Sequence, residues 1–508
     1  MIKIIPVQQE FRQPLPVIYG NIDYTEFKNI IERISEIIEL AGLDSKVMCY
    51  AVDEAFKAAL KVFDGSSEEF PGLKEKDQIH IQITARKALR CTIAKELTGL
   101  SFRKMSCRLA DSPLLQQFCL LDKYGVVRVP SKSTLERFEK MIPEELIRDL
   151  IKELVMAACD EMNTSQMIQK LKLEKEISLA DYYLDTTCVK ANIHFPVDWV
   201  LLRDATRTIM KAINLLRKRG LKHRMADPSE FIKEMNKLCI KMTHARNAKD
   251  SKKKRKQIYR LMKKLIRKVE KHGKCYKELL IERWEETDLS EKQAYQIIYR
   301  LDNVLEQIPA AVHQAHERII GERRIKNEEK ILSLYDENIN VLVRKKAEAM
   351  VEFGNKLLLG EQVNGLIIDW QLYKDKTPAD TKLLSESLLR IHDTYNCFPD
   401  NVSSDRGFFS KQNKKFLSDR KINDYMCPKP VEELRVRLQD KTFSEHQTRR
   451  AQTEARIGIF KNSFLGKPLR SKCFVNRSLN VAWAVLTHNL WVLARMPIAN
   501  LDKQKIPA

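Results

Sequence analysis

Residues 177–191 read ISLADYYLDTTCVKA, and this stretch decides the fold that the sequence predicts. β-Branched and aromatic side chains are frequent in it, as they are in β-strands, so we expect a strand that reaches Asp185. Side chains alternate between the two faces of a strand, which places Asp181 on the same face as Asp185. A buried carboxylate without a partner is unfavourable. We therefore expect Asp185 to face a metal ion or, in a purely structural role, an Arg or Lys side chain.

The chain before this strand is predicted to be helical. Apolar residues recur at helical spacing over residues 23–165. One helix should run to Thr98, with Gly99 just beyond it as the C-cap. Ser101 is expected to cap the next helix, and Ser133 with Glu136 has the spacing of a capping box. Short helices separated by capped turns suit a DNA-binding bundle of the helix-turn-helix kind, or a plain structural domain.

A strongly basic segment follows the strand, within a second helical region at residues 203–325. Residues 249–274 contain 13 Lys and Arg against two acidic residues, and their apolar residues keep a helical face. This pattern predicts an ordered amphipathic helix with one basic side. Contact with phosphates explains so dense a charge better than a solvated surface, which is the alternative. The candidate phosphate ligands are Lys253, Lys256, Arg260, Lys263 and Arg267.

Strand-like stretches return over residues 331–375. A helix should open at Asp380, and a short strand should end at Asp405, where Gly407 allows a sharp exit. On the predicted helix at 445–460, four residues share one stripe. A mid-helix glycine costs about 1 kcal/mol relative to alanine, so Gly458 suggests a face that a backbone or phosphate must approach. A surface ion-pair helix would explain the charges on this stripe but not the glycine. The four residues are Arg450, Glu454, Gly458 and Lys461.

Composition narrows the class of protein. The 508 residues are 44% hydrophobic and 31% charged, as in globular proteins, and the scarcity of glycine (15) and proline (17) favours long helices. The net charge of +22 favours a polyanionic partner, although a basic solvated surface would give the same value. The eleven cysteines include no CxxC pair, which argues against a zinc ribbon and against a disulfide framework. No apolar run could span a bilayer and the first residues, MIKIIP, are too short for a signal peptide, so we expect a cytoplasmic, nucleoid-associated protein without membrane contact.

Seven short motifs follow one another along the chain: LTGLSFR at 97–103, PSKSTLERF at 130–138, LDTTCVKAN at 184–192, VEFGNKL at 351–357, PADTKLL at 378–384, SDRGFFS at 404–410 and RAQTEARIGIFK at 450–461. Taken in order, they resemble the DDE transposases of bacterial insertion sequences, in the broad clan of the insertion-sequence-4 and insertion-sequence-5 types. The resemblance covers most of residues 75–200 and 330–495. One position departs from it, because the signature often has a tyrosine where this chain has Gln447, which puts the tyrosine-dependent contact in doubt.

The resemblance implies a site and a reaction. Asp185, Asp405 and Glu454 would be the catalytic residues and the ligands of two Mg²⁺ ions, with Mn²⁺ able to substitute, and Arg450 and Lys461 would contact transposon-end DNA. Two such ions lie ~3.5–4 Å apart in enzymes that transfer phosphodiesters, so the three carboxylates must converge. The expected partners are double-stranded DNA, at the transposon ends and at the target, and a second copy of the chain in the DNA complex.

The expected fold is a helix-rich α+β protein. Its ribonuclease-H-like catalytic core, residues 171–202 and 326–508, would be split by the basic helical insertion at 203–325 and preceded by a helical DNA-binding domain at 1–170. The expected function is DNA transposase, which cleaves and transfers strands at the ends of an insertion sequence. Two alternatives stay open: a catalytically silent DNA-binding protein derived from a transposase, and another ribonuclease-H-like nuclease such as a resolvase. Retention of all three acidic residues argues against the first, and the helical N-terminal domain with the Arg-Glu-Lys helix argues against the second.

Overall fold

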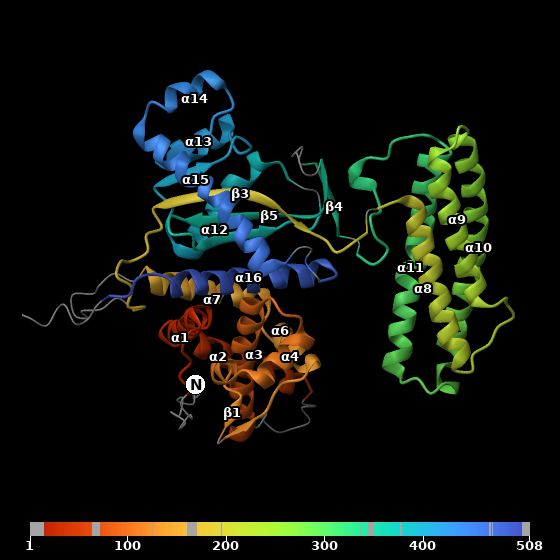
Figure 1. Ribbon diagram of the computed structural model, residues 1–508, viewed down its shortest axis with the longest axis horizontal. Helices are drawn as coiled ribbons and strands as arrows, with labels where there is room; N and C mark the ends of the chain where they lie inside the picture. Colours follow the sequence, from red (N-terminus) through yellow and green to blue (C-terminus); the bar gives the residue numbers. More distant parts are fainter. Residues whose placement is uncertain are drawn as a thin grey trace, which may run out of the picture.

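The computed structural model describes residues 15–62, 72–123, 125–159, 170–194, 196–336, 338–343, 350–375, 378–466, 469 and 471–499. These residues form a helix-rich α+β protein (Figure 1). The first six residues, on which the signal-peptide expectation rests, lie outside this part of the chain. Within the described ranges, no helix combines the length and the apolar character that crossing a membrane requires.

The N-terminal part is helical, as expected. Gly99 ends α3 in the left-handed conformation at φ 61°, and the Ser101 hydroxyl accepts the Lys104 amide at the start of α4. The capping box at Ser133 is wrong, because the Ser131 hydroxyl accepts the Thr134 amide and the helix begins two residues earlier than predicted. The elements are α1 (Ile22–Leu40), α2 (Leu43–Val62), α3 (Glu75–Thr98), α4 (Phe102–Asp111), α5 (Pro113–Phe118), a hairpin of β1 (Asp122–Lys123) and β2 (Val126–Val127), α6 (Lys132–Met141) and α7 (Glu144–Ala158).

A mixed six-stranded sheet lies beyond these helices. The predicted strand through Asp185 is β3 (Asp181–Lys190), which pairs antiparallel with β5 (Val351–Gln362) and parallel with β7 (Asn401–Ser404). The expectation of strands in the region 331–375 is confirmed, whereas β8 was not predicted. The strand order is β4-β5-β3-β7-β8, and β6 also pairs with β5. The remaining strands are β4 (Asn340–Val343), β6 (Ile367–Leu372) and β8 (Asn423–Met426).

Helices cover both faces of the sheet. Tyr182 of β3 bonds Ser387 of α12 (Asp380–Tyr395) at 2.6 Å, so the even-numbered side chains of β3 face α12. The odd-numbered side chain of Tyr183 bonds His446 of α15 (Lys441–Ile459) at 3.1 Å on the opposite face. The chain continues from α15 into a π-helical turn (Phe460–Leu465) and α16 (Phe474–Ala494). Two shorter helices, α13 (Lys411–Asp419) and α14 (Val431–Arg437), join β7 to α15.

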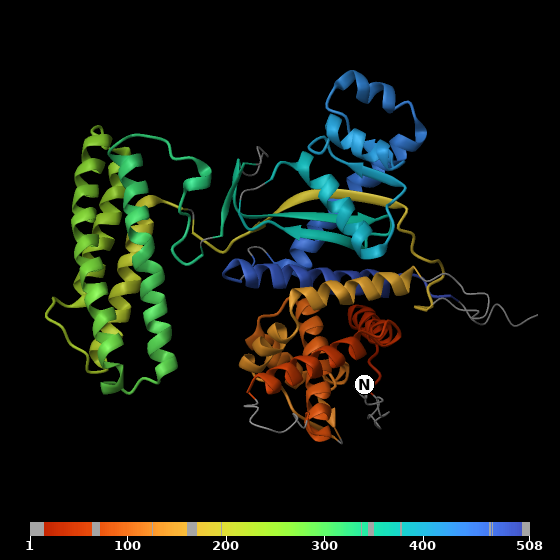
Figure 2. The ribbon, with the colours of Figure 1, turned by 180° about the vertical axis from the view of Figure 1, so that it is seen from behind.

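The helix α16 lies between the sheet and the N-terminal helices. Figures 1 and 2 show it alongside α7, with the sheet on one side and α1 to α6 on the other. Its Trp483 is fully buried and donates to the Glu139 carbonyl oxygen of α6 at 3.2 Å. A single apolar core accordingly runs from the N-terminal helices into the sheet.

The basic segment belongs to a bundle of four long helices with a separate apolar core. Figure 1 shows this bundle to one side of the sheet. The chain that leads from the bundle back to the sheet is held by Arg477 of α16, which is fully buried. Arg477 forms an ion pair with Asp336 and donates to the Asn338 carbonyl oxygen at 2.9 Å. The four helices are α8 (Asp198–Lys218), α9 (Pro228–His244), α10 (Ser251–Arg283) and α11 (Glu291–Ile319).

Candidate active site

Asp185 and Asp405 lie side by side at the point where two parallel strands meet α15. In the pairing of β3 with β7, Leu184 is opposite Ser404. The residue after Leu184 is Asp185, and the residue after Ser404 is Asp405. Neighbouring strands are about 4.8 Å apart and paired residues point to the same face. Each carboxylate also accepts a backbone amide, Thr186 N at 2.6 Å and Gly407 N at 2.9 Å. The two aspartates that the sequence predicts as site residues are therefore neighbours in the fold.

Burial and nearby acidic side chains raise the pKa of both Asp185 and Asp405. Burial, together with the negative charges of Asp405 and Glu454, raises the pKa of Asp185 to about 7, while the Thr186 amide and Arg450 oppose them. The pKa of Asp405 is also raised, first by burial and then by the nearby charge of Asp380. Like charges held together in a partly buried site are characteristic of places where a cation is bound or a proton is exchanged.

The stripe predicted on α15 faces these aspartates. Arg450 lies 3.9 Å from the Glu454 carboxylate, and both charges act on Asp185. Lys461 lies two residues beyond the end of α15, in the π-helical turn, and its Nζ donates to Thr187 Oγ1 at 3.1 Å. Thr187 shares a face of β3 with Asp185, by the two-residue period of a strand. Arg450, Glu454 and Lys461 are thus brought to the same face as the two aspartates.

Gln447, which stands where the transposase signature often has a tyrosine, orients Arg450. Its side-chain amide donates to the Tyr425 carbonyl oxygen at 2.6 Å, and its Oε1 accepts Arg450 Nε at 3.1 Å. Because the amide group is fixed at both ends, the guanidinium is held near Asp185 and Asp405, on both of which its charge acts. Gln447 therefore acts on the site through Arg450.

Two residues of the site were not recognised in the sequence as site residues. Lys356 of β5 ion-pairs with Asp380 at the start of α12, and Thr186 Oγ1 donates to the same carboxylate at 3.2 Å. A Cβ on Gly407 would lie 2.8 Å from Asp380 Oδ2 and 3.0 Å from Asp405 Oδ1, so only glycine fits between them. The signal was present, since Lys356 and Asp380 both lie in the quoted motifs.

The carboxylate oxygens of the site suit a hard cation such as Mg²⁺, but only two of the three carboxylates lie close together. Asp185 and Asp405 present adjacent carboxylates, which are the ligands that Mg²⁺ prefers. The Glu454 side chain is 65% exposed and stays near Arg450. Throughout the described ranges, no three His, Cys, Asp or Glu side chains are grouped closely enough to hold a metal ion. The two aspartates therefore fit one side of a magnesium site, and Glu454 would have to turn inward to complete it.

The predicted basic helix is α10, and its cations differ in how they are engaged. Lys253, Arg260 and Arg267 are exposed, as expected, and Lys263 is partly exposed. Lys256 departs from the expectation of a side chain directed at phosphate, because it lies 2.9 Å from Glu322, a residue beyond α11. The charge of Lys252 is also taken up by Glu322, at 2.8 Å. Both ion pairs lower the Glu322 pKa to about 2.

Comparisons with known proteins add no relative to this description, since no family model, no curated protein and no solved structure matches the chain.

Proposed function

We propose that the chain is a DNA transposase that cleaves and joins strands through Asp185, Asp405 and Glu454. The observation that carries the proposal is a pair of aspartates side by side, Asp185 in the middle of β3 and Asp405 just after the parallel strand β7. Both face a helix that carries Arg450 and Glu454. Convergence of carboxylates from separate elements is what two-metal phosphodiester chemistry requires. The strand order, three antiparallel strands followed by two parallel ones, supports a ribonuclease-H-like core interrupted by the four-helix bundle.

The residues of the site have distinct parts in this proposal. Asp185, Asp405 and Glu454 would hold Mg²⁺, which when bound supplies activation of the attacking oxygen and stabilisation of the leaving oxygen. Asp185, with its pKa raised to about 7, must release its proton when a cation binds. Arg450 and Lys461 lie on the same face as the two aspartates, and their positive charges would bind the phosphate of the DNA strand there. Gln447 keeps the Arg450 guanidinium directed there.

The basic face of α10 supplies a DNA-binding surface in the same proposal. Figure 1 shows α10 on the side of the bundle away from the sheet. Lysine ammonium groups act on phosphates as point charges and carry little base information, so this face would hold the duplex without reading its sequence. A homodimer would place two such bundles on the two ends of one element.

Strand cleavage of the element's own DNA tests the proposal. The substrate is a plasmid carrying this gene with its flanking sequence, so that both ends are present, incubated with protein and Mg²⁺. We expect nicks or double-strand breaks at the ends with wild type and none with Asp405→Asn at equal DNA binding. Absence of cleavage by wild-type protein that binds the ends would instead support the silent DNA-binding alternative, which the exposure of Glu454 favours. Cleavage of branched DNA without preference for the ends would support the nuclease alternative.

A further inference from the structure

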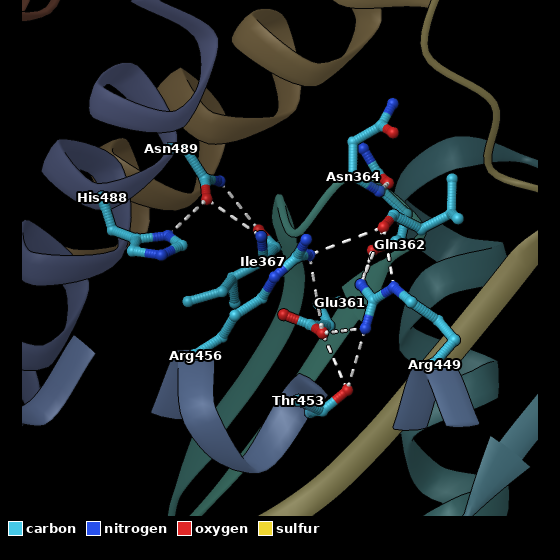
Figure 3. A network of polar contacts seen from close by, with 10 residues as sticks. Glu361, Gln362, Asn364, Ile367, Arg449, Thr453, Arg456, His488 and Asn489 are labelled. Carbon is cyan, nitrogen blue, oxygen red and sulfur yellow. Dashed lines mark hydrogen bonds and ion pairs between the residues drawn. The ribbon is translucent and has the colours of Figure 1, made fainter. Parts of the chain in front are cut away.

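A buried polar cluster fastens α15 to the hairpin between β5 and β6. Figure 3 shows its members converging from the end of β5 and from successive turns of α15. Glu361 is only 4% exposed and lies at the centre. It accepts Arg449 Nη1 at 3.0 Å and Thr453 Oγ1 at 2.8 Å, and Arg456 Nη1 lies 3.8 Å from it. One buried carboxylate is therefore satisfied by three side chains of a single helix.

Arg449 extends this attachment to the backbone of the hairpin. Its Nε and Nη2 donate to the Val363 carbonyl oxygen at 2.9 and 2.8 Å, and Nη2 also donates to Gln362 O at 3.1 Å. The guanidinium carbon lies 4.6 Å from the centre of the Tyr183 ring. A planar guanidinium with its donors taken up in this way holds a single orientation.

The hairpin is shaped to receive Arg456. Gly365 has a φ of +94°, and a Cβ at this position would lie 2.1 Å from Arg456 Nη1. Both the backbone conformation and the close approach therefore require glycine. Burial and the neighbouring positive charge of Arg449 lower the pKa of Arg456, while the Glu361 charge opposes them. The sequence of the turn thus leaves space for a second guanidinium beside the first.

The attachment sets the rotation of α15 about its own axis. Residues 449, 453 and 456 are spaced by four and three, so they form one stripe of the helix. Arg450 and Glu454 each follow a member of that stripe by one residue, which places them about 100° further round. With the first stripe held by Glu361, the second is directed at Asp185, on which both of its charges act.

We propose that Glu361 is a positioning residue that, through Arg449 and Thr453, fixes the rotation of α15 and so directs the face with Arg450 and Glu454 toward Asp185. This inference rests on the transposase function proposed above. In the pairing of β3 with β5, Glu361 is opposite Tyr183, whereas Asp185 is opposite Leu359. Glu361 therefore lies away from the two aspartates and acts on the reaction only through α15. Loss of its charge would leave two partly buried guanidiniums without their carboxylate, and the helix would shift or loosen. A displacement of about 1 Å at a reacting group lowers rates about 100-fold.

The test compares Glu361→Gln with Glu361→Asp and with a matched control, Asp369→Asn. Asp369 is also a buried carboxylate of the sheet, 5% exposed, but its partner is Arg390 of α12 at 2.6 Å rather than α15. Thermal unfolding shows how far each variant is destabilised. Hydrogen exchange of the α15 amides reports on the attachment without any reaction. Cleavage of end DNA is measured as a rate at saturating DNA, as the DNA concentration for half-saturation, and as the Mg²⁺ concentration for half-maximal rate.

We expect Glu361→Gln to speed exchange in α15 but not in α12, and to lower the saturated rate about 100-fold. It should also raise the Mg²⁺ requirement while the half-saturating DNA concentration stays the same. Glu361→Asp should recover part of the rate, and Asp369→Asn should lose stability but keep the wild-type Mg²⁺ requirement. Unchanged exchange in α15, or equal Mg²⁺ requirements for Glu361→Gln and Asp369→Asn, would overturn the inference. If wild type itself does not cleave, the proposed function fails. Faster exchange in α15 of Glu361→Gln would then still show that Glu361 fixes the helix, whereas unchanged exchange would overturn the inference by itself.

Discussion

Replacing Asp185 by asparagine should stabilise the protein when metal is chelated and the pH is high. The pKa of Asp185 is raised to about 7 from its ordinary value of 3.8, so the folded state binds the proton more tightly than the unfolded state. The stability contributed by this group is then fully present below pH 3.8 and is lost as the pH rises through 7. Asparagine keeps the shape of the side chain without its charge and escapes this loss.

The size of the effect follows from the pKa difference. About three pKa units at about 1.4 kcal/mol each give up to about 4 kcal/mol at pH values above 7. This is an upper bound because the Asp185 side chain retains some exposure to solvent. Urea unfolding with a chelator, at about pH 4 and about pH 8, measures the free energy of unfolding in both proteins. The variant should exceed wild type at the higher pH and match it at the lower one.

Two comparisons make this result specific to the site. Asp181→Asn changes a carboxylate on the same face of β3 that accepts Asn401 Nδ2 at 2.8 Å, and it should give no gain in stability because it disturbs this hydrogen bond. Adding Mg²⁺ should raise the stability of wild type, since a ligand that binds only the folded state stabilises it, but not that of Asp185→Asn. A gain that is absent, or is the same at both pH values, would refute the reasoning that burial and the charges of Asp405 and Glu454 disfavour the ionised form of Asp185.

Three further outcomes are expected. Gly407→Ala, whose Cβ would press on Asp380 and Asp405, should lower end cleavage about 100-fold without loss of DNA binding; a normal rate would show that the two carboxylates can separate freely. Burial lowers the pKa of His488 to about 4 from its ordinary value of 6.5. Wild type should therefore lose up to about 3 kcal/mol of stability as the pH falls from 6.5 to 4. In the same urea titration, His488→Gln should lose less over that range. Removing positive charges from α10 should weaken the dependence of DNA affinity on salt. Each phosphate that α10 no longer neutralises should flatten the slope of log affinity against log salt by about 0.9, equally for end and random DNA. An unchanged slope would indicate that the basic face is a solvated or protein-binding surface. The variant for that measurement combines Lys253→Gln, Arg260→Gln and Arg267→Gln.

Much of the fold could be predicted where local patterns are strong. The β-branched run through Asp185, the helix caps at Gly99 and Ser101 and the apolar face of α10 all appear where expected. The strand β8 was missed because Asn423–Met426 is short and polar, and it pairs only with β7 at the edge of the sheet. Its formation depends on a partner rather than on its own sequence.

Long-range charge pairing limited the prediction of the site. The acidic partner of Lys256 is Glu322, which follows α11, and nothing in the local sequence indicates that α10 and the end of α11 lie together. The sequence predicts Asp380 only as the first residue of a helix. In the structure its carboxylate lies close to Asp405 and forms an ion pair with Lys356. Local sequence shows which residues carry charge, whereas the partner that neutralises each charge is decided by packing.

The orientation of α15 shows the same limit most clearly. The spacing of Arg450, Glu454 and Lys461 predicts that they share a face, but it leaves open which way that face points. The direction depends on Glu361, 88 residues before Arg449 in the chain, and on a glycine turn that admits Arg456. A helix of this composition, exposed along much of its length, has few apolar neighbours to fix its rotation. Buried charge pairs are sensitive to geometry in a way that apolar packing is not, so they can define one rotation of the helix among several that would bury similar surface.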